Sequence, residues 1–219
     1  MALLALLAGG AWFYRIQEQT MRHKVEEDLS AIARLKADQI AGWRKNQLAV
    51  AAALQESIFL LQNVECFSAD PSDVHGEDLR TRLRDRAKQH GYADILLVDP
   101  DGKVLLSLSR TGRLHSGYAS VLSAALAGRT PVFIDLRTDT QDLTPHISVV
   151  APLFTDAEHA QKPLGALILV SNASQFLYPL IQSWPTASPT AETLLVRRDG
   201  DAVLFVNELR HRRDAAFKL

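Results

Sequence analysis

Apolar residues recur at helical spacing through the first part of the chain. From Arg15 to about Val64 there is no Pro, and Gly42 is the only Gly. The apolar positions lie three or four residues apart, and Lys36 and Gln47 interrupt their stripe. They are Val25, Leu29, Ile32, Ile40, Trp43, Val50, Leu54, Ile58 and Leu61. The pattern predicts one long helix over 15–64. Either this helix packs only on its own domain, or residues 25–43 also pair with the same helix of a second subunit.

Shorter elements follow this helix. The stretch CFSADPSDVHG breaks it, and EDLRTRLRDRAKQHG predicts a charged helix that ends at Gly91. Strand patterns then appear in DILLVDPDGKVLLSLS, PVFIDLR, HISVVAPLF and LGALILVSNAS, with a helical pattern in SGYASVLSAALAG between the first two. Because short turns join consecutive strands, we expect an antiparallel sheet with helices on its faces, an α+β fold.

The first strand pair has a second copy later in the chain. Aligning LLV..DG in DILLVDPDGKVLL with ETLLVRRDGDAVLFV places Leu96 on Leu194 and Gly102 on Gly200, an offset of 98 residues. Each copy predicts a hairpin with a Gly in its turn. Only 19 residues follow Gly200, too few to complete a second domain like the first. We therefore expect residues 187–219 to form a hairpin with one poorly covered apolar face.

The N-terminus carries fourteen residues without a charge, MALLALLAGGAWFY. A helix of that length covers about 21 Å, whereas a bilayer core needs about 30 Å. We expect a transmembrane helix that begins before residue 1, with a signal peptide or a helix end buried in a soluble partner as alternatives. The basic flank that follows, from Arg15 to Lys36, also contains Glu18 and Glu26, which is typical of an amphipathic charged helix.

Composition excludes several classes of function. The chain has 219 residues, 47% of them hydrophobic, and a formal net charge of -1, which does not favour a nucleic-acid partner. Cys66 is the only cysteine, so no internal disulfide can form. The HExxH, GxGxxG, GxxxxGK and GxSxG motifs are absent from the sequence, and the seven His residues are scattered. We predict no catalytic residues, no metal site and no cofactor.

Taken together, these segments resemble a known family. The long helix with LKADQIAGWRKNQL, the unit that opens with ILLVDPDGKVLLS and closes with PLGALILVSNASQFLYPLI, and the second hairpin are similar to double Cache sensor domains. These PAS-like (PDC) modules belong to bacterial histidine kinases, diguanylate cyclases and chemoreceptors. The resemblance implies a truncated membrane helix at 1–14, a spine helix at 15–64, a membrane-distal module at 65–186 and the start of a second module at 187–219.

The resemblance also implies a function. We expect the extracytoplasmic, ligand-sensing region of a protein of the inner (plasma) membrane, which forms a homodimer through the long helix and binds a small molecule. The chain lacks most of a second module and any output domain, which the family pattern includes. A membrane-anchored protein-interaction or assembly module is the alternative, and an extracytoplasmic enzyme is a third.

Strand alternation suggests where a ligand would bind. It places Val132, Ile134 and Leu136 on one face and Phe133, Asp135 and Arg137 on the other, and separates Ile147 and Val149 from His146 and Ser148. If the first set packs on the long helix side, the polar set faces a cavity together with Tyr118. The candidate ligand-binding residues are therefore Tyr118, Phe133, Asp135, Arg137, His146 and Ser148.

The chemistry of these side chains indicates a ligand class. An Arg fork beside His, Ser and Tyr suits a carboxylate, and Asp135 favours an amine, so an amino acid or small organic acid fits. The alternative is that Asp135 and Arg137 form only a solvated strand face. Arg110, Arg113 and His115, before the helix of SGYASVLSAALAG, are weaker candidates that would close the pocket.

Overall fold

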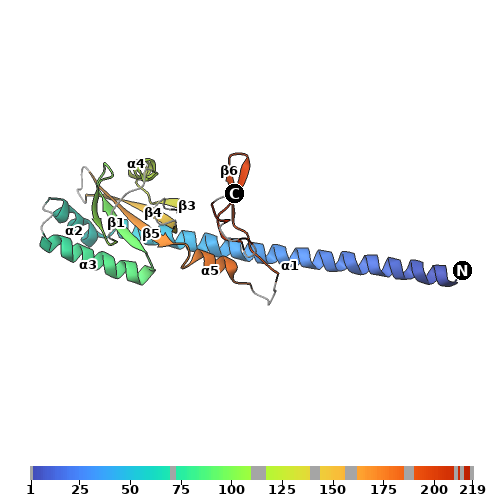
Figure 1. Ribbon diagram of the computed structural model, residues 1–219. Coiled ribbons are helices and arrows are strands. Elements are labelled where there is room, and N and C mark those ends of the chain that lie inside the picture. Colours follow the sequence, from blue (N-terminus) through green and yellow to red (C-terminus); the bar gives the residue numbers. More distant parts are fainter. Residues whose placement is uncertain are drawn as a thin grey trace.

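The computed structural model describes residues 2–69, 73–109, 117–138, 144–155, 162–184, 190–209, 212 and 215–217. One long helix, α1 (Ala2–Gln55), runs from the N-terminal end into a folded unit of helices and strands (Figure 1). In the part of the chain that is described, no helix combines the length and the apolar character that a bilayer crossing requires.

The helix predicted over 15–64 is not continuous, and that prediction is wrong at one point. α1 ends at Gln55 and a separate helix, α2 (Ile58–Ala69), begins after Ser57. The Ser57 hydroxyl accepts a hydrogen bond from the amide of Leu60 at 3.4 Å, as an N-cap does at the third helical residue. The Ser57 amide donates to the Leu54 oxygen, at 3.2 Å. Ser57 thus caps the N-terminus of α2. This helix packs against α3 (Asp73–His90).

The helix stop predicted at Gly91 is confirmed. Gly91 has a φ of 71°, and the amide of Tyr92 donates to the oxygen of Ala87 at 2.9 Å. This 6→1 bond closes the C-terminus of α3 in the manner of a Schellman motif, which needs a residue that tolerates positive φ.

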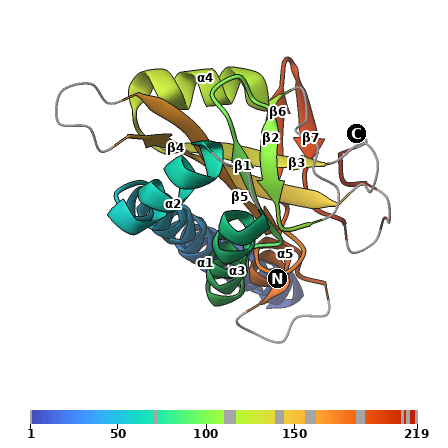
Figure 2. The same cartoon turned by 90° about the vertical axis from the view of Figure 1, so that its left-hand side faces the viewer.

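Five strands form one antiparallel sheet, which confirms the α+β class. They are β1 (Asp94–Val98), β2 (Val104–Ser107), β3 (Val132–Thr138), β4 (Pro145–Phe154) and β5 (Pro163–Asn172). Their spatial order is β2-β1-β5-β4-β3. α1, α2 and α3 cover one face of the sheet, and α4 (Tyr118–Gly128) covers the other (Figure 2).

The central strands are buried on both faces. Ile95, Leu97 and Leu167 point to the side of α1 to α3, where they pack with Leu79 and Leu83. The intervening residues Leu96, Val98 and Ile168 pack beneath α4 with Leu122 and Ala125. This explains the continuous apolar runs in β1 and β5, where a sheet with one wet face would show alternation.

The second hairpin is present and resembles the first. β6 (Val196–Asp199) and β7 (Ala202–Phe205) form a two-stranded sheet, and the turn residues Gly102 and Gly200 have φ values of 86° and 60°. The hairpin follows a short helix, α5 (Leu177–Gln182). Val206 packs into a cluster with Leu136, Ile147 and Ile181, whereas Val196 and Val203 are 51% and 57% exposed. One side of the hairpin is therefore docked, and apolar residues remain exposed elsewhere on it.

Candidate functional site

A β-bulge in β3 separates the predicted site residues. Ile134 pairs with Ser148, but the next pair is Arg137 with His146, so Asp135 and Leu136 together oppose Ile147. Such a bulge shifts the alternation of the bulged strand. Leu136, which is 2% exposed, therefore packs with Ile147 on the α1 side. The unbroken alternation expected for residues 132–137 is wrong for this reason.

The face assignment of three neighbouring residues is also corrected. Phe133 was expected to face a cavity beside Tyr118, but it contacts Trp43 and Arg44 of α1. Val132 and Ile134 were expected on the long helix side, but both pack beneath α4 with Tyr118. The sheet has apolar layers on both faces, so a single apolar stripe could not indicate which face met α1.

Tyr118 and Ser148 do come together. The Tyr118 hydroxyl lies 2.8 Å from the Ser148 hydroxyl, and the two residues are 6% and 1% exposed. α4 supplies the tyrosine and β4 supplies the serine, and both lie in the apolar layer between helix and sheet. A buried hydroxyl pair in such a layer satisfies both groups and offers hydrogen bonds to a polar ligand.

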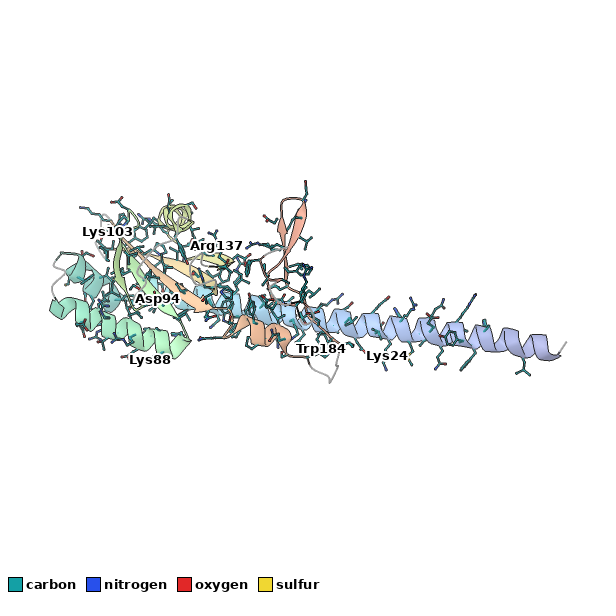
Figure 3. All side chains as sticks on the ribbon, in the orientation of Figure 1. Lys24, Lys88, Asp94, Lys103, Arg137 and Trp184 are labelled. Atoms are coloured by element: carbon teal, nitrogen blue, oxygen red, sulfur yellow. The ribbon has the colours of Figure 1, made fainter. Side chains whose placement is uncertain are left out.

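Arg137 and His146 extend this polar group toward the start of α4. They are directly opposed in the β3–β4 ladder, so their side chains leave the same face of the sheet. Arg137 is labelled in Figure 3. A Cβ placed on Gly117 would lie 2.1 Å from its Nη1, so the guanidinium lies against the N-terminus of α4. His146 Nδ1 lies 3.1 Å from the oxygen of Thr144. We call Tyr118, Arg137, His146 and Ser148 the α4-face group.

One buried polar residue elsewhere on the sheet was not predicted. Asp94, at the start of β1, accepts hydrogen bonds from the amides of Leu108 and Ser109, both at 3.0 Å (Figure 3). The Ser107 hydroxyl donates to it at 3.0 Å, and the Ser109 hydroxyl also donates to it. Asp94 thus fixes the point at which the chain leaves β2 toward α4. The SLS sequence that begins with the last residue of β2 is the only signal of this arrangement. Arg110, Arg113 and His115 lie outside the described residues.

Phe133 and Asp135 line a different pocket. It has a volume of ≈ 380 Å³ and lies between α1, the β3 side of the sheet and the second hairpin. We call it the junction pocket. The sequence gives no signal that Arg44 and Arg197 lie beside Phe133, because each is an isolated charge in its own segment. The lining residues are Ile40, Trp43, Arg44, Phe133, Asp135, Leu136, Ile147, Leu177, Leu195, Val196, Arg197 and Val206.

Comparison with known proteins places this fold among sensor domains. No protein-family profile and no curated protein matches the sequence. Among solved structures, the ligand-binding domain of the Campylobacter jejuni chemoreceptor Tlp3, in complex with 4-methylisoleucine, is similar with a TM-score of 0.55 and 16% identity. That match covers 70% of this chain and 60% of the receptor domain.

Two further structures give the same result. The sensor domain of the V. cholerae histidine kinase DctB matches with a TM-score of 0.57 and 12% identity, over 74% of this chain and 60% of that domain. The ligand-binding domain of the Pseudomonas aeruginosa PAO1 amino acid chemoreceptor PctC, in complex with GABA, matches with a TM-score of 0.52 and 16% identity, over 73% and 65%. The chain thus matches less than two thirds of the length of these domains. It has the fold of chemoreceptor and histidine kinase sensor domains, as its resemblance to double Cache domains predicted.

Proposed function

We propose that this chain is the ligand-sensing region of a membrane-bound bacterial signal-transduction protein and binds a small molecule on the α4 face of its sheet. The observation that carries the proposal is the α4-face group. It sets a buried hydroxyl pair beside an Arg and a His in a fold shared with sensor domains. A few convergent polar groups in an otherwise apolar layer are typical of small-molecule sites.

The ligand class follows from the side chains present. The Arg137 guanidinium is a planar fork suited to a carboxylate, and the hydroxyls of Tyr118 and Ser148 each donate or accept. Asp135 does not join this group, because the bulge places it on the junction pocket. The α4 face therefore favours a small carboxylate, such as an amino acid or an organic acid, with Arg137 holding the acid group. The PctC and Tlp3 domains were solved with GABA and 4-methylisoleucine.

A thermal-shift screen of the whole chain against amino acids, amines and small organic acids tests this proposal. We expect the melting temperature to rise with carboxylates and not with the matching amines. Arg137→Gln should abolish the shift, while Arg84→Gln, an exposed charge on α3, should leave it unchanged. For an aliphatic carboxylate, a shift that persists in Arg137→Gln would remove the assigned site. A screen without any hit would favour the alternative, a protein-interaction module.

The long helix supports a role in signalling across a membrane. From Lys36 onward α1 packs on the folded unit, but Met21, Val25 and Leu29 are exposed on the part that projects from it (Figure 1). These residues are spaced by four, so they lie on one face of the helix. We propose that this face pairs with a second copy of the chain and that the folded unit is extracytoplasmic. A topology reporter fused near residue 65 of the full-length protein should give an extracytoplasmic signal, and a cytoplasmic signal would refute this placement.

A further inference from the structure

The junction pocket joins parts of the chain that are far apart in sequence. α1 supplies Trp43 and Arg44, β3 supplies Phe133 and Asp135, and β6 supplies Arg197. Its volume of ≈ 380 Å³ falls within the range of small-molecule sites, about 300 to 1,000 Å³. It lies on the side of the sheet that faces α1, opposite the α4-face group.

The walls of the pocket are aromatic and aliphatic. The ring of Trp43 is stacked on Phe176, with centroids 4.9 Å apart, and meets the ring of Phe133 edge-on at 6.1 Å. These two contacts fix the orientation of the indole. Leu136, Ile147 and Leu177 are all buried and supply aliphatic surface. The walls therefore suit an apolar body, and the aromatic rings favour a flat one.

Three charged side chains lie on the same pocket. The Arg44 guanidinium carbon lies 4.9 Å from the centroid of the Phe133 ring, and Nη1 of Arg197 donates to the oxygen of Leu136 at 2.9 Å. Asp135 accepts a bond from the amide of Leu136 at 2.8 Å. Two cations and one anion give the pocket a formal charge of +1. A guanidinium has five N–H donors, so Arg197 can hold Leu136 and a second acceptor.

We propose that the junction pocket is a second ligand site, which binds a small monocarboxylate with an aromatic body. The acid group would be held by Arg44 and Arg197, and the ring would lie against Trp43 and Phe133. Asp135 disfavours a second carboxylate on the ligand, because like charges repel in a partly enclosed pocket. The inference does not depend on a ligand at the α4 face, since no residue of the α4-face group lines this pocket.

Such a ligand would also connect the five-stranded sheet with the second hairpin. Because the pocket is lined by both the five-stranded module and the second hairpin, the complete site exists only when the hairpin is docked. A ligand that binds only the docked form stabilises that form. Binding at this site should therefore protect the amides of β6 and β7 from hydrogen exchange.

The test uses Trp43 as the reporter. The chain has three Trp residues, so Trp12→Phe with Trp184→Phe leaves Trp43 alone in the full chain. The probe is 3-phenylpropionate, and phenethylamine is the matched cation. We expect the acid to change Trp43 fluorescence saturably and to slow exchange in β6 and β7, and the amine to do neither. High salt should weaken binding, because Arg44 is exposed.

Three variants locate the binding. Arg44→Gln should weaken the affinity for 3-phenylpropionate about tenfold. Lys45→Gln, the same charge change at the next, exposed position of α1, should leave it unchanged. Tyr118→Phe, which alters the α4-face group, should also leave it unchanged. No saturable response to the acid, equal affinity in Arg44→Gln, or a loss confined to Tyr118→Phe would each overturn the proposal.

Discussion

The side-chain nitrogen of Lys36 lies 2.6 Å from the backbone oxygen of Leu180, on the last turn of α5. It also donates to the backbone oxygen of Ser183 and, at 3.2 Å, to the Ser183 hydroxyl. Lys36 is 5% exposed, and this burial lowers its pKa below the usual value. A cation at a helix C-terminus satisfies carbonyl groups that lack partners within the helix. Lys36 thus fastens α1 to the segment between the five-stranded module and the second hairpin.

Replacing this lysine should loosen that segment. Lys36→Met keeps an unbranched, helix-forming side chain but leaves the carbonyl groups of Leu180 and Ser183 without their charged donor. We expect the free energy of unfolding to fall by about 1 to 3 kcal/mol, measured by urea denaturation. Lys45→Met, at an exposed position of the same helix, should change it by less than about 0.5 kcal/mol. Equal effects of the two substitutions would show that Lys36 does not hold α5.

Two tyrosines should make stability fall at high pH. Burial raises the pKa of Tyr92 to about 12, and burial together with the charge of Glu208 raises that of Tyr178 to about 12. Their usual value is 10.0, so the folded protein holds these protons more tightly than the unfolded chain. Their contribution is complete below about pH 10 and is lost as the pH rises toward 12.

Urea denaturation between pH 8 and about pH 11 measures this loss. The Tyr178 hydroxyl donates to the oxygen of Val206 at 2.7 Å, so the protonated form also ties α5 to the chain after β7. Tyr178→Phe should be less stable than the natural protein at pH 8, and its stability should fall less steeply above pH 10. A parallel fall in both proteins would contradict the origin assigned to this pH dependence.

Two glycines should respond to Ala in opposite directions. Gly165, in β5, has a φ of 126°, and a Cβ there would lie 1.9 Å from the oxygen of Val98. Gly165→Ala should therefore lower the free energy of unfolding by about 2 to 4 kcal/mol. Gly42 lies within α1 with nothing within 4 Å of its Cβ position, so Gly42→Ala should raise it by about 0.5 to 1 kcal/mol. A Gly165→Ala protein as stable as the natural one would mean that β1 and β5 are less closely packed than described.

The projecting half of α1 should control self-association. Val25→Glu together with Leu29→Glu places two charges on the exposed apolar face. If that face is the dimer contact, sedimentation equilibrium should show a dimer for the natural chain and a monomer for the double variant. Ala31→Glu, on another side of the helix, should remain dimeric. A natural chain that is monomeric at all accessible concentrations would contradict pairing through this face.

The order of elements could be predicted from the sequence because it depends on local signals. Periodicity, the Gly91 stop and the repeated DG turns are each contained within a few residues. The break at Ser57 also has a local signal, a serine three residues before Leu60, but the apolar periodicity continues across it. Lys36, an interruption of the apolar stripe, finds its partners more than 140 residues later, at Leu180 and Ser183.

The candidate site was harder to predict, because its geometry depends on strand pairing. The segment VFIDLR alternates without a break, and the bulge appears only when its register against β4 is known. Tyr118 and Ser148 were grouped correctly because they lie on well-defined positions of a helix and a regular strand. Arg44 and Arg197 share a pocket only through the docking of the second hairpin, which no spacing in the sequence indicates.

Isothermal titration of the whole chain with the strongest aliphatic carboxylate from the screen tests whether the α4-face group binds the ligand. We predict one saturable binding event in the natural protein that depends on the α4-face group. The affinity should fall about tenfold in Tyr118→Phe and in Ser148→Ala, because each removes a hydroxyl from the buried pair, and should stay unchanged in Arg44→Gln. An affinity that is the same in the natural protein, Tyr118→Phe and Ser148→Ala would contradict it.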